Sequence, residues 1–304
     1  MPDNTFGART AAALSRRGPL CVGIDPHAQL LRSWGLDDSL DGARQFCETL
    51  VAAVAGHVAF VKPQSAFFER FGSGGIALLE NVIAESRRAG ALVLLDVKRG
   101  DIGSTMSAYA QAYLDADSSL AVDAITASPY LGFGSLQPLF DTAQANDRGV
   151  FVLALTSNSE GGQVQLARRK DGRTVAQSII DEAAALNAEA EPLGDIGIVM
   201  GATVPGCKES NALTLRQSTY GITHNVVHNG ETAHDLSELN GPILVPGMGV
   251  QGGQPSDLRR VLGASAQWAI PSYSREIARH GPTVASVRSV AEQTAKDCAD
   301  AIGR

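Results

Sequence analysis

Residues 91–102 read Ala-Leu-Val-Leu-Leu-Asp-Val-Lys-Arg-Gly-Asp-Ile, an apolar run that ends in closely spaced charges. Such a run is typical of a buried parallel strand. Asp96 and Lys98 stand two positions apart, so on a strand their side chains share one face. Asp101 follows a glycine at which the chain can turn away. Because these charges are costly to bury unless they pair, the stretch predicts a core strand that ends in either a salt-bridged terminus or a chemical site.

Seven more short apolar or β-branched runs alternate with segments of helical periodicity. The eight predicted strands lie near Leu20–Asp25, Val58–Lys62, Ala91–Lys98, Ala121–Ser128, Gly149–Ser157, Ile196–Ala202, Pro242–Pro246 and Gln267–Ser272. Amphipathic helices are expected at Ile76–Arg88, Thr174–Ala190 and Val284–Ile302. Alternating strands and helices favour an α/β fold with a parallel sheet, and eight strands close a (β/α)8 TIM barrel. A doubly wound open sheet is the alternative.

The polar segment Cys207–Gly230 makes the connection between the sixth and seventh strands long for a barrel. We expect it to form a surface insertion in a single barrel domain that spans residues 1–304. No other segment has the composition of a linker, a repeat or a low-complexity tract.

The composition argues against several classes of protein. A net charge of −7 over 304 residues disfavours binding to nucleic acid or to an anionic membrane. No run approaches the roughly 18 apolar residues of a membrane span, and the N-terminus lacks the pattern of a secretory signal. The cysteines at 21, 47, 207 and 298 are scattered, which is typical of reduced thiols. These features together predict a cytoplasmic protein.

Lysine is rare in this chain and its placement is informative. Among the 25 basic residues, the lysines are Lys62, Lys98, Lys170, Lys208 and Lys296. Lysine can lose and regain its proton, whereas arginine effectively cannot. Lys62 ends the second predicted strand and Asp25 ends the first, so both are expected beside Asp96 and Lys98 at the carboxyl end of a barrel, where active sites lie. A snorkelling lysine and an ordinary Asp-Pro turn are the plainer interpretations.

A glycine-rich run, Pro-Gly-Met-Gly-Val-Gln-Gly-Gly at residues 246–253, follows the seventh strand. Gly247, Gly249 and Gly252 form G-x-G-x-x-G, but a dinucleotide site needs this motif in the first βα unit, with an acid about 20 residues later. Barrel loops after strands seven and eight usually hold a phosphate, which exposed backbone N–H groups can cradle. Arg275 can add a guanidinium fork. A purely structural glycine turn is the alternative.

Two other groups of polar residues are less specific. Thr156-Ser157-Asn158 ends the fifth strand, where it can read the edge of a polar ring or serve as an ordinary turn. His224 and His228 have i,i+4 spacing, but Asn225 stands where the zinc motif needs glutamate. Because no third ligand is evident, we expect no metal site and no cofactor.

These residues resemble a known family. Residues 96–105, DVKRGDIGST, resemble the D-x-K-x-x-D-I-x-x-T signature of the orotidine 5′-phosphate decarboxylases, and the likeness covers nearly the whole chain. Gly23–Pro26 resembles the family's first-strand aspartate motif, Phe60–Gln64 its lysine strand and Pro246–Gly253 its phosphate loop. Ala127–Gly132 is similar to the type 2 bacterial branch. The departures are the segment 207–230 and the weakly patterned stretch 267–275.

The resemblance implies decarboxylation of orotidine 5′-monophosphate (OMP) to uridine 5′-monophosphate (UMP) in pyrimidine biosynthesis. It implies that Lys98 donates a proton to the carbon that loses carbon dioxide, with Asp96 near the departing carboxylate and Lys62 and Asp101 completing the charges. It also implies a homodimer in which Asp101 and Thr105 reach the partner's site. The implied substrate contacts are Asp25 and Thr105 for ribose, Ser157 for the pyrimidine, Gln251 and Arg275 for phosphate, with Ile102, Pro246, Gly247, Gly249 and Gly252 also contacting substrate.

The chemistry of the residues agrees with this reaction. Loss of the carboxylate leaves a carbanion, which fixed charge can stabilise without a cofactor and which the Lys98 ammonium can protonate. One alternative is a related barrel of the 3-keto-gulonate 6-phosphate decarboxylase or hexulose-phosphate synthase type. Those enzymes resemble this charged run but use magnesium and carry an acid in place of Lys62. The other alternative is a catalytically idle nucleotide-binding barrel.

Overall fold

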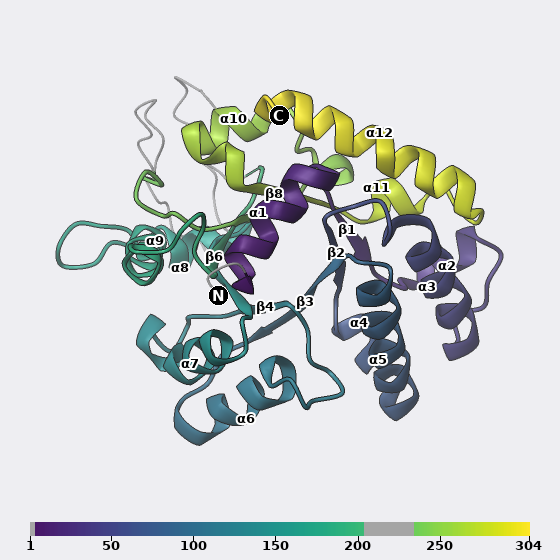
Figure 1. Ribbon diagram of the computed structural model, residues 1–304, viewed down its shortest axis with the longest axis horizontal. Coiled ribbons are helices and arrows are strands. Elements are labelled where there is room, and N and C mark those ends of the chain that lie inside the picture. The colour runs from purple at the N-terminus through teal and green to yellow at the C-terminus, as the bar shows by residue number, and fades with distance from the viewer. Residues whose placement is uncertain (1–3, 204–233) are drawn as a thin grey trace, which may run out of the picture.

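Eight parallel strands form a closed barrel in a computed structural model that describes residues 4–203 and 234–304 (Figure 1). The strands are β1 (Cys21–Ile24), β2 (Phe60–Pro63), β3 (Leu92–Arg99), β4 (Ala124–Ala127), β5 (Gly149–Leu155), β6 (Ile196–Met200), β7 (Ile243–Val245) and β8 (Ala269–Tyr273). They pair in sequence order, and β8 closes the ring against β1. The predicted (β/α)8 barrel is therefore confirmed and the open sheet is wrong. The expected insertion at 207–230, with His224 and His228, lies outside the described residues.

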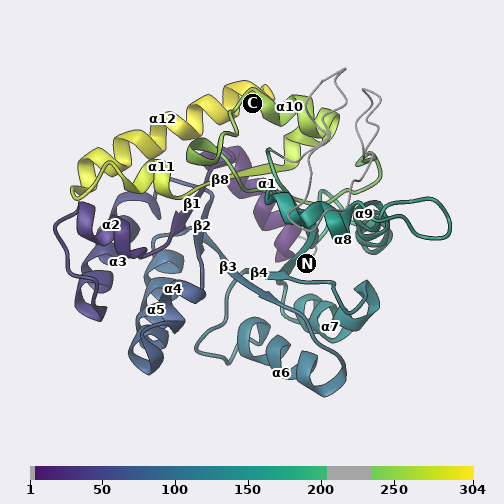
Figure 2. The same cartoon turned by 180° about the vertical axis from the view of Figure 1, so that it is seen from behind.

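Helices surround the barrel in Figures 1 and 2. They are α1 (Phe6–Arg17), α2 (Ala28–Ser33), α3 (Leu40–Val54), α4 (Ala66–Glu69), α5 (Gly72–Arg88), α6 (Gly103–Leu114), α7 (Gln137–Ala145), α8 (Gly162–Gln165), α9 (Val175–Asn187), α10 (Asp257–Leu262), α11 (Arg275–Ala278) and α12 (Val284–Ile302), with 3-10 turns η2 (Phe133–Leu136), η3 (Ser159–Gly161), η4 (Gly249–Gln251) and η5 (Gly263–Trp268). The three helices expected from periodicity correspond to α5, α9 and α12. In the part of the chain that the structure describes, every helix is too short or too polar to cross a bilayer.

The amino-terminal end of the barrel is covered by α1, a helix that the sequence pattern did not single out (Figure 1). Phe6 packs edge-on against Phe60 and Phe151, with ring centroids 6.3 and 6.0 Å apart. The N–H of Gly7 donates to Asp195 Oδ1 at 2.7 Å. These contacts fill this end of the barrel with aromatic side chains and seal it.

A buried carboxylate beneath β4 ties several elements together at the same end. Asp123 Oδ1 accepts hydrogen bonds from Arg9 at 2.5 Å and from Arg148 at 3.4 Å. Asp123 Oδ2 accepts the N–H of Val93 at 2.9 Å and lies 3.9 Å from Nε of Arg87. We call Asp123, Arg9, Arg87 and Arg148 the basal cluster.

Candidate active site

A cavity of about 630 Å³ lies at the carboxyl ends of the strands, opposite α1. The predicted site residues that line it are Asp25, Lys62, Asp96, Lys98, Ser157, Pro246, Gly247, Gln251 and Arg275. They follow or end β1, β2, β3, β5, β7 and β8. The closed barrel thus brings together residues that are far apart in the sequence. Asp101, Ile102, Thr105, Gly249 and Gly252 do not line the cavity.

Three charged side chains form a connected array at the cavity floor. The Lys62 ammonium lies 3.2 Å from Asp96 Oδ2, and the Lys98 ammonium lies 2.5 Å from Asp96 Oδ1. The Lys62 and Asp96 side chains are buried, whereas 45% of the Lys98 side chain is exposed. We call Lys62, Asp96 and Lys98 the charge array. Its geometry is that of one carboxylate held between two lysines, one of which extends toward solvent.

The charge array keeps its two buried members, Asp96 and Lys62, ionised. Burial alone would raise the pKa of Asp96, but the ammonium groups of Lys62 and Lys98 hold that pKa well below its usual value. Burial alone would lower the pKa of Lys62, but the carboxylates of Asp96 and Asp25 hold it above its usual value. Burial raises the pKa of the Cys21 thiol to about 12. Cys21 therefore stays a neutral thiol beneath the array and is a poor nucleophile.

The backbone of β3 is irregular where it carries Lys98. The pairing of β3 with β4 shifts register between Leu95 and Arg99, and Lys98 has φ of +46°. A non-glycine residue in this left-handed region is uncommon and often marks a functional site. The strand alternation that placed Asp96 and Lys98 on one face therefore does not hold strictly at Lys98. The two side chains nevertheless meet.

Thr126 on β4 is a cavity residue that the sequence analysis missed. Its hydroxyl donates to Asp96 Oδ1 at 2.8 Å and accepts the N–H groups of Val97 and Lys98 at 3.1 and 2.9 Å. Thr126 lies in a plain apolar strand, so only its alternation with Ile125 and Ala127 indicated an inward side chain. Nothing in the local sequence indicated its contact with Asp96.

Asp25 follows β1 and has one bonded and one unbonded oxygen. Its Oδ2 accepts from the Ser274 hydroxyl at 2.5 Å. Its Oδ1 is buried and has no hydrogen-bond partner among the residues of the structure that are described. A buried carboxylate oxygen without a partner is costly. Asp25 therefore offers an acceptor to a hydroxyl-bearing ligand in the cavity.

The glycine-rich loop after β7 is folded on itself. The N–H groups of Gly249, Gly252 and Gly253 donate to carbonyl oxygens of the same loop at 2.7–2.9 Å. Gly247, Gly249 and Gly252 all have positive φ, which glycine adopts without strain. Gly249 and Gly252 therefore shape the loop, while Gly247 and Gln251 line the cavity. Two of the three glycines of the motif, Gly249 and Gly252, thus determine the conformation of the loop and do not line the cavity.

The segment after β5 carries Ser157 and is held by side-chain contacts. Gln165 of α8 accepts the N–H of Thr156 at 2.9 Å and donates to the Thr156 hydroxyl at 2.8 Å. That hydroxyl is within 2.6 Å of Asn158 Oδ1. Gln165, another residue that the sequence analysis missed, thus fixes the strand end on which Ser157 lies.

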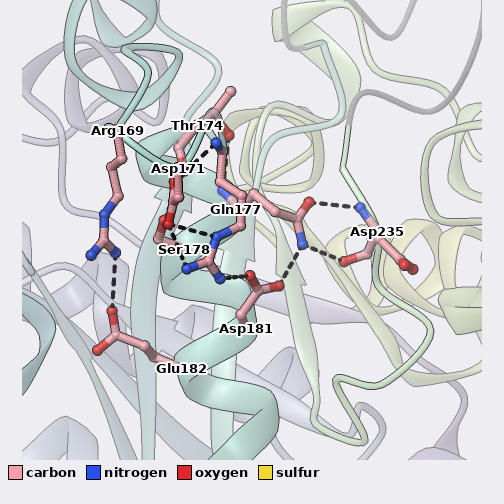
Figure 3. Close-up of polar contacts among 9 residues, drawn as sticks. Arg169, Asp171, Thr174, Gln177, Ser178, Asp181, Glu182 and Asp235 are labelled. Carbon is pink, nitrogen blue, oxygen red and sulfur yellow. Dashed lines mark hydrogen bonds and ion pairs between the residues drawn. The ribbon is translucent and has the colours of Figure 1, made fainter.

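A polar network on α9 anchors the same segment farther out (Figure 3). Arg173 binds Asp171 at 2.7 Å and Asp181 at 2.5 Å. Gln177 donates to Asp181 and exchanges hydrogen bonds with the backbone of Asp235 at 2.8 and 3.0 Å (Figure 3). The network joins the segment after β5 to the segment that leads into β7. Because these groups are largely exposed, each contact contributes little energy.

Asp101, Ile102 and Thr105 lie beyond the end of β3, outside the cavity. Asp101 Oδ1 accepts the N–H of Ile102 at 2.8 Å. Ile102 is 62% exposed, and Tyr130 in the loop after neighbouring β4 is 79% exposed. Large apolar side chains exposed at one rim are typical of an interaction surface. The single chain therefore does not bring these three residues to its own cavity.

Metal ligands do not gather within residues 4–203 and 234–304. No group of three histidine, cysteine, aspartate or glutamate side chains there has the geometry to hold a metal ion. The site chemistry described above instead consists of ammonium groups, carboxylates and hydroxyls.

The chain matches the family model described as "Orotidine 5'-phosphate decarboxylase / HUMPS family" over residues 18–290. The chain belongs to this family. It is 54% identical over 298 residues to an orotidine 5′-phosphate decarboxylase of Salinispora arenicola, with 98% of each chain covered. It is 50% identical over 297 residues to the orotidine 5′-phosphate decarboxylase of Streptomyces coelicolor, again over 98% of each. The resemblance inferred from residues 96–105 is confirmed.

A solved structure agrees with this membership of the orotidine 5′-phosphate decarboxylase / HUMPS family. A crystal structure of a candidate orotidine 5′-phosphate decarboxylase from Streptomyces avermitilis is 50% identical to this chain. It superimposes with a TM-score of 0.89 over 99% of this chain and 97% of that chain. The barrel fold of the family is therefore shared nearly from end to end.

Proposed function

We propose that this chain is an orotidine 5′-phosphate decarboxylase, which converts OMP to UMP and carbon dioxide in pyrimidine biosynthesis. The observation that carries the proposal is the charge array, two lysines joined by one buried carboxylate on the floor of a cavity large enough for a nucleotide. Relatives that are 50–54% identical over 98% of their length bear this name and support the assignment.

The array provides the charges that the reaction needs. When the bond between the pyrimidine ring and its carboxylate breaks, the electron pair remains on the ring carbon and carbon dioxide leaves. The Lys98 ammonium stabilises that carbanion and then transfers a proton to it, which forms the new C–H bond of UMP. Because 45% of the Lys98 side chain is exposed, the neutral amine can regain a proton from water.

Asp96 and Lys62 act on the same step without transferring a proton. A buried, ionised Asp96 beside the substrate carboxylate repels it, and the repulsion falls as carbon dioxide forms, so the transition state is favoured over the substrate. Lys62, held 3.2 Å from Asp96, keeps that carboxylate ionised in a buried place.

The remaining cavity residues would hold the rest of the nucleotide. The unbonded Oδ1 of Asp25 suits a ribose hydroxyl, and Ser157 suits the pyrimidine edge. Gln251 and Arg275 suit the phosphate. The N–H groups of Gly249, Gly252 and Gly253 already donate to carbonyl oxygens within the loop. The phosphate site that we propose therefore depends mainly on the side chains of Gln251 and Arg275 and less on the N–H groups of the glycine-rich loop.

We also propose a homodimer in which Asp101 and Thr105 reach into the partner's site, with Ile102 beside them. Their place outside the chain's own cavity and the exposed Ile102 and Tyr130 support this arrangement. Mixing Lys98→Ala with Asp101→Ala subunits should restore activity to up to about a quarter of the sites, because about half of the dimers are mixed and one of the two sites in each mixed dimer has both residues intact. Absence of recovery after subunit exchange has been demonstrated would contradict a shared site.

The magnesium-using alternative conflicts with the geometry of β2. Lys62 lies beside Asp96 and Asp25, and an ammonium at that place repels a divalent cation. The alternative of a catalytically idle barrel gives the charge array no role.

We further propose that residues 1–304 form one domain and that the protein is cytoplasmic.

The experiment follows the loss of OMP absorbance with purified protein that has been treated exhaustively with chelator. Wild type and Lys296→Ala, which changes an exposed lysine on α12, should turn over OMP alike. Lys98→Ala should lose at least about 10⁴-fold in kcat, because both charge stabilisation and proton donation are removed, yet should still bind UMP in calorimetry. A strict need for magnesium would favour the first alternative, and UMP binding by a wild type without turnover would favour the second.

A further inference from the structure

One hydroxyl connects the charge array to the backbone that carries it. Thr126 on β4 is 1% exposed. Its Oγ1 donates to Asp96 Oδ1 at 2.8 Å and accepts two backbone N–H groups, of Val97 and of Lys98, at 3.1 and 2.9 Å. A hydroxyl has one donor and two acceptor sites. All of its capacity is therefore used on β3 next to the array.

The two accepted N–H groups lie at the irregular part of β3. Between Leu95 and Arg99 the pairing with β4 shifts register, which removes the regular ladder partner of a backbone N–H. Lys98 also has φ of +46°, a conformation that is unfavourable for lysine unless the surroundings hold it. The Thr126 hydroxyl is the acceptor that holds both N–H groups, so it stabilises the turn of backbone from which the Lys98 side chain reaches Asp96.

The third bond of the hydroxyl acts on the carboxylate itself. Asp96 Oδ1 accepts from Thr126 and from the Lys98 ammonium, and Asp96 Oδ2 accepts from Lys62. Lys62 on β2 and Lys98 on its own strand contact Asp96, and Cys21 on β1 also interacts with it. Asp25, which follows β1, interacts with Lys62 and Cys21. Thr126 is the neutral hydrogen-bond donor to Asp96. Its hydrogen bond orients Oδ1 and also stabilises the negative charge on that oxygen.

We propose that Thr126 is a positioning residue for the charge array: its hydroxyl holds the Lys98 backbone in its strained conformation and orients Asp96 between the two lysines. The inference rests on the proposed decarboxylase function for its catalytic consequence. The plainer interpretation is a buried threonine that only satisfies two N–H groups of a bulge. The two differ in whether the loss of the hydroxyl changes chemistry or only stability.

Two substitutions separate these interpretations. Thr126→Val keeps the shape but removes the donor and both acceptors, whereas Thr126→Ser keeps the hydroxyl. With Thr126→Val we expect kcat for OMP to fall about 10²-fold, as a displacement near 1 Å at the reacting groups does, while the Kd for UMP stays nearly unchanged. Thr126→Ser should recover most of the lost kcat. Thr10→Val is the control, since Thr10 is buried in α1 and its hydroxyl has no partner in the described part of the chain.

A titration of Asp96 gives a readout that does not depend on turnover. In protein with ¹³C-labelled aspartate, the Asp96 carboxyl resonance is identified by its loss in Asp96→Asn. We expect the pKa of Asp96 to rise in Thr126→Val, because a hydrogen bond to the charged form is lost, and to return in Thr126→Ser. The acid limb of the kcat profile should move to higher pH in the same order.

The outcomes distinguish the two hypotheses. A wild type that fails to turn over OMP refutes the proposed function, and the Asp96 titration still decides the role of Thr126. Wild-type kcat and an unchanged Asp96 titration in a folded Thr126→Val would overturn the positioning role. If the valine variant does not fold, Thr126→Ala, which also lacks the hydroxyl but occupies less space, takes its place with the same expected results.

Discussion

Two buried aspartates lie at opposite ends of the barrel, at the neighbouring strands β3 and β4, and each is surrounded by cations. Asp96, at the carboxyl end of β3, contacts two lysines and lines a cavity. Asp123, just before β4, contacts Arg9, Arg148 and, at 3.9 Å, Arg87. Asp123 also accepts a backbone N–H, and it is absent from the cavity lining. The cations are lysines around Asp96 and arginines around Asp123, and Asp96 borders a cavity whereas Asp123 does not.

On the proposed function, the difference separates a charge cluster that acts on a substrate from one that holds the fold together. Arginine keeps its proton at any ordinary pH and forms directional forks, which suits a fixed joint between α1, α5 and the strands. Lysine can deliver a proton and regain it, which is useful only beside a cavity that admits substrate. The kind of cation and the presence of a cavity therefore predict function better than burial or ion-pair distance, which are similar in the two clusters.

The largest expected effect comes from neutralising each aspartate in turn. Asp96→Asn should lower kcat by at least about 10³-fold, because it removes the repulsion of the substrate carboxylate and the alignment of both lysines. Asp123→Asn should leave kcat per folded molecule unchanged. It should instead lower the free energy of unfolding by about 3 kcal/mol, near the lower end for breaking a buried ion pair, because Arg9 and Arg87 are partly exposed.

Steady-state assays and urea unfolding of both variants test this pair. Asp141→Asn, which changes an exposed aspartate on α7, controls for the change in net charge. An Asp123→Asn enzyme that folds stably but has lost turnover would contradict the division between the two clusters.

The sequence predicted one of these clusters and not the other. Asp96 and Lys98 are close in the chain, and a strand followed by a turn placed them at a barrel mouth, so local pattern was enough. Asp123 meets Arg9 across 114 positions of sequence, and no local spacing indicates such a contact. α1 was not predicted either. Its position depends on the packing of Phe6 against Phe60 and Phe151 at the end of the closed barrel, and these contacts are not visible in the local sequence.

The candidate site shows the same limit on a smaller scale. The strand ends predicted which side chains would gather, and Lys62, Asp25, Ser157 and Arg275 do line one cavity. The register shift of β3 that sets Lys98 was not predictable from alternation, because a bulge depends on the neighbouring strand. Asp101 and Thr105 lie outside the cavity, so one chain alone does not test their predicted contacts.

Exchanging the two kinds of cation sharpens the comparison with a smaller expected effect. Lys98→Arg keeps the positive charge that stabilises the carbanion but removes a donor that can release its proton, so kcat should fall about 10²-fold, the lower end for loss of a general acid. Arg9→Lys keeps the charge beside Asp123 but loses the fork that binds Asp123 at 2.5 Å and the carbonyl of Asp147 at 2.7 Å. It should lower the free energy of unfolding by about 1 kcal/mol and leave kcat unchanged. Near-normal turnover by Lys98→Arg would show that the charge alone suffices and would remove the proton-donor role.

The smallest expected effect is a pH dependence of stability that originates at the mouth of the barrel. Burial would raise the pKa of Asp96, but Lys62 and Lys98 hold it below the unfolded value, which is about 3.9. A group with a lowered folded pKa stabilises the fold above its unfolded pKa, and this contribution is lost as the pH falls toward the folded pKa. The difference in free energy of unfolding, wild type minus Asp96→Asn, should therefore be constant from neutral pH to about pH 5 and decrease below about pH 4. Urea unfolding of the two proteins at each pH measures it. A difference that changes mainly between pH 5 and 7 would mean that the two lysines do not hold Asp96 ionised, and the distinction between a reactive and a structural carboxylate would then need another basis.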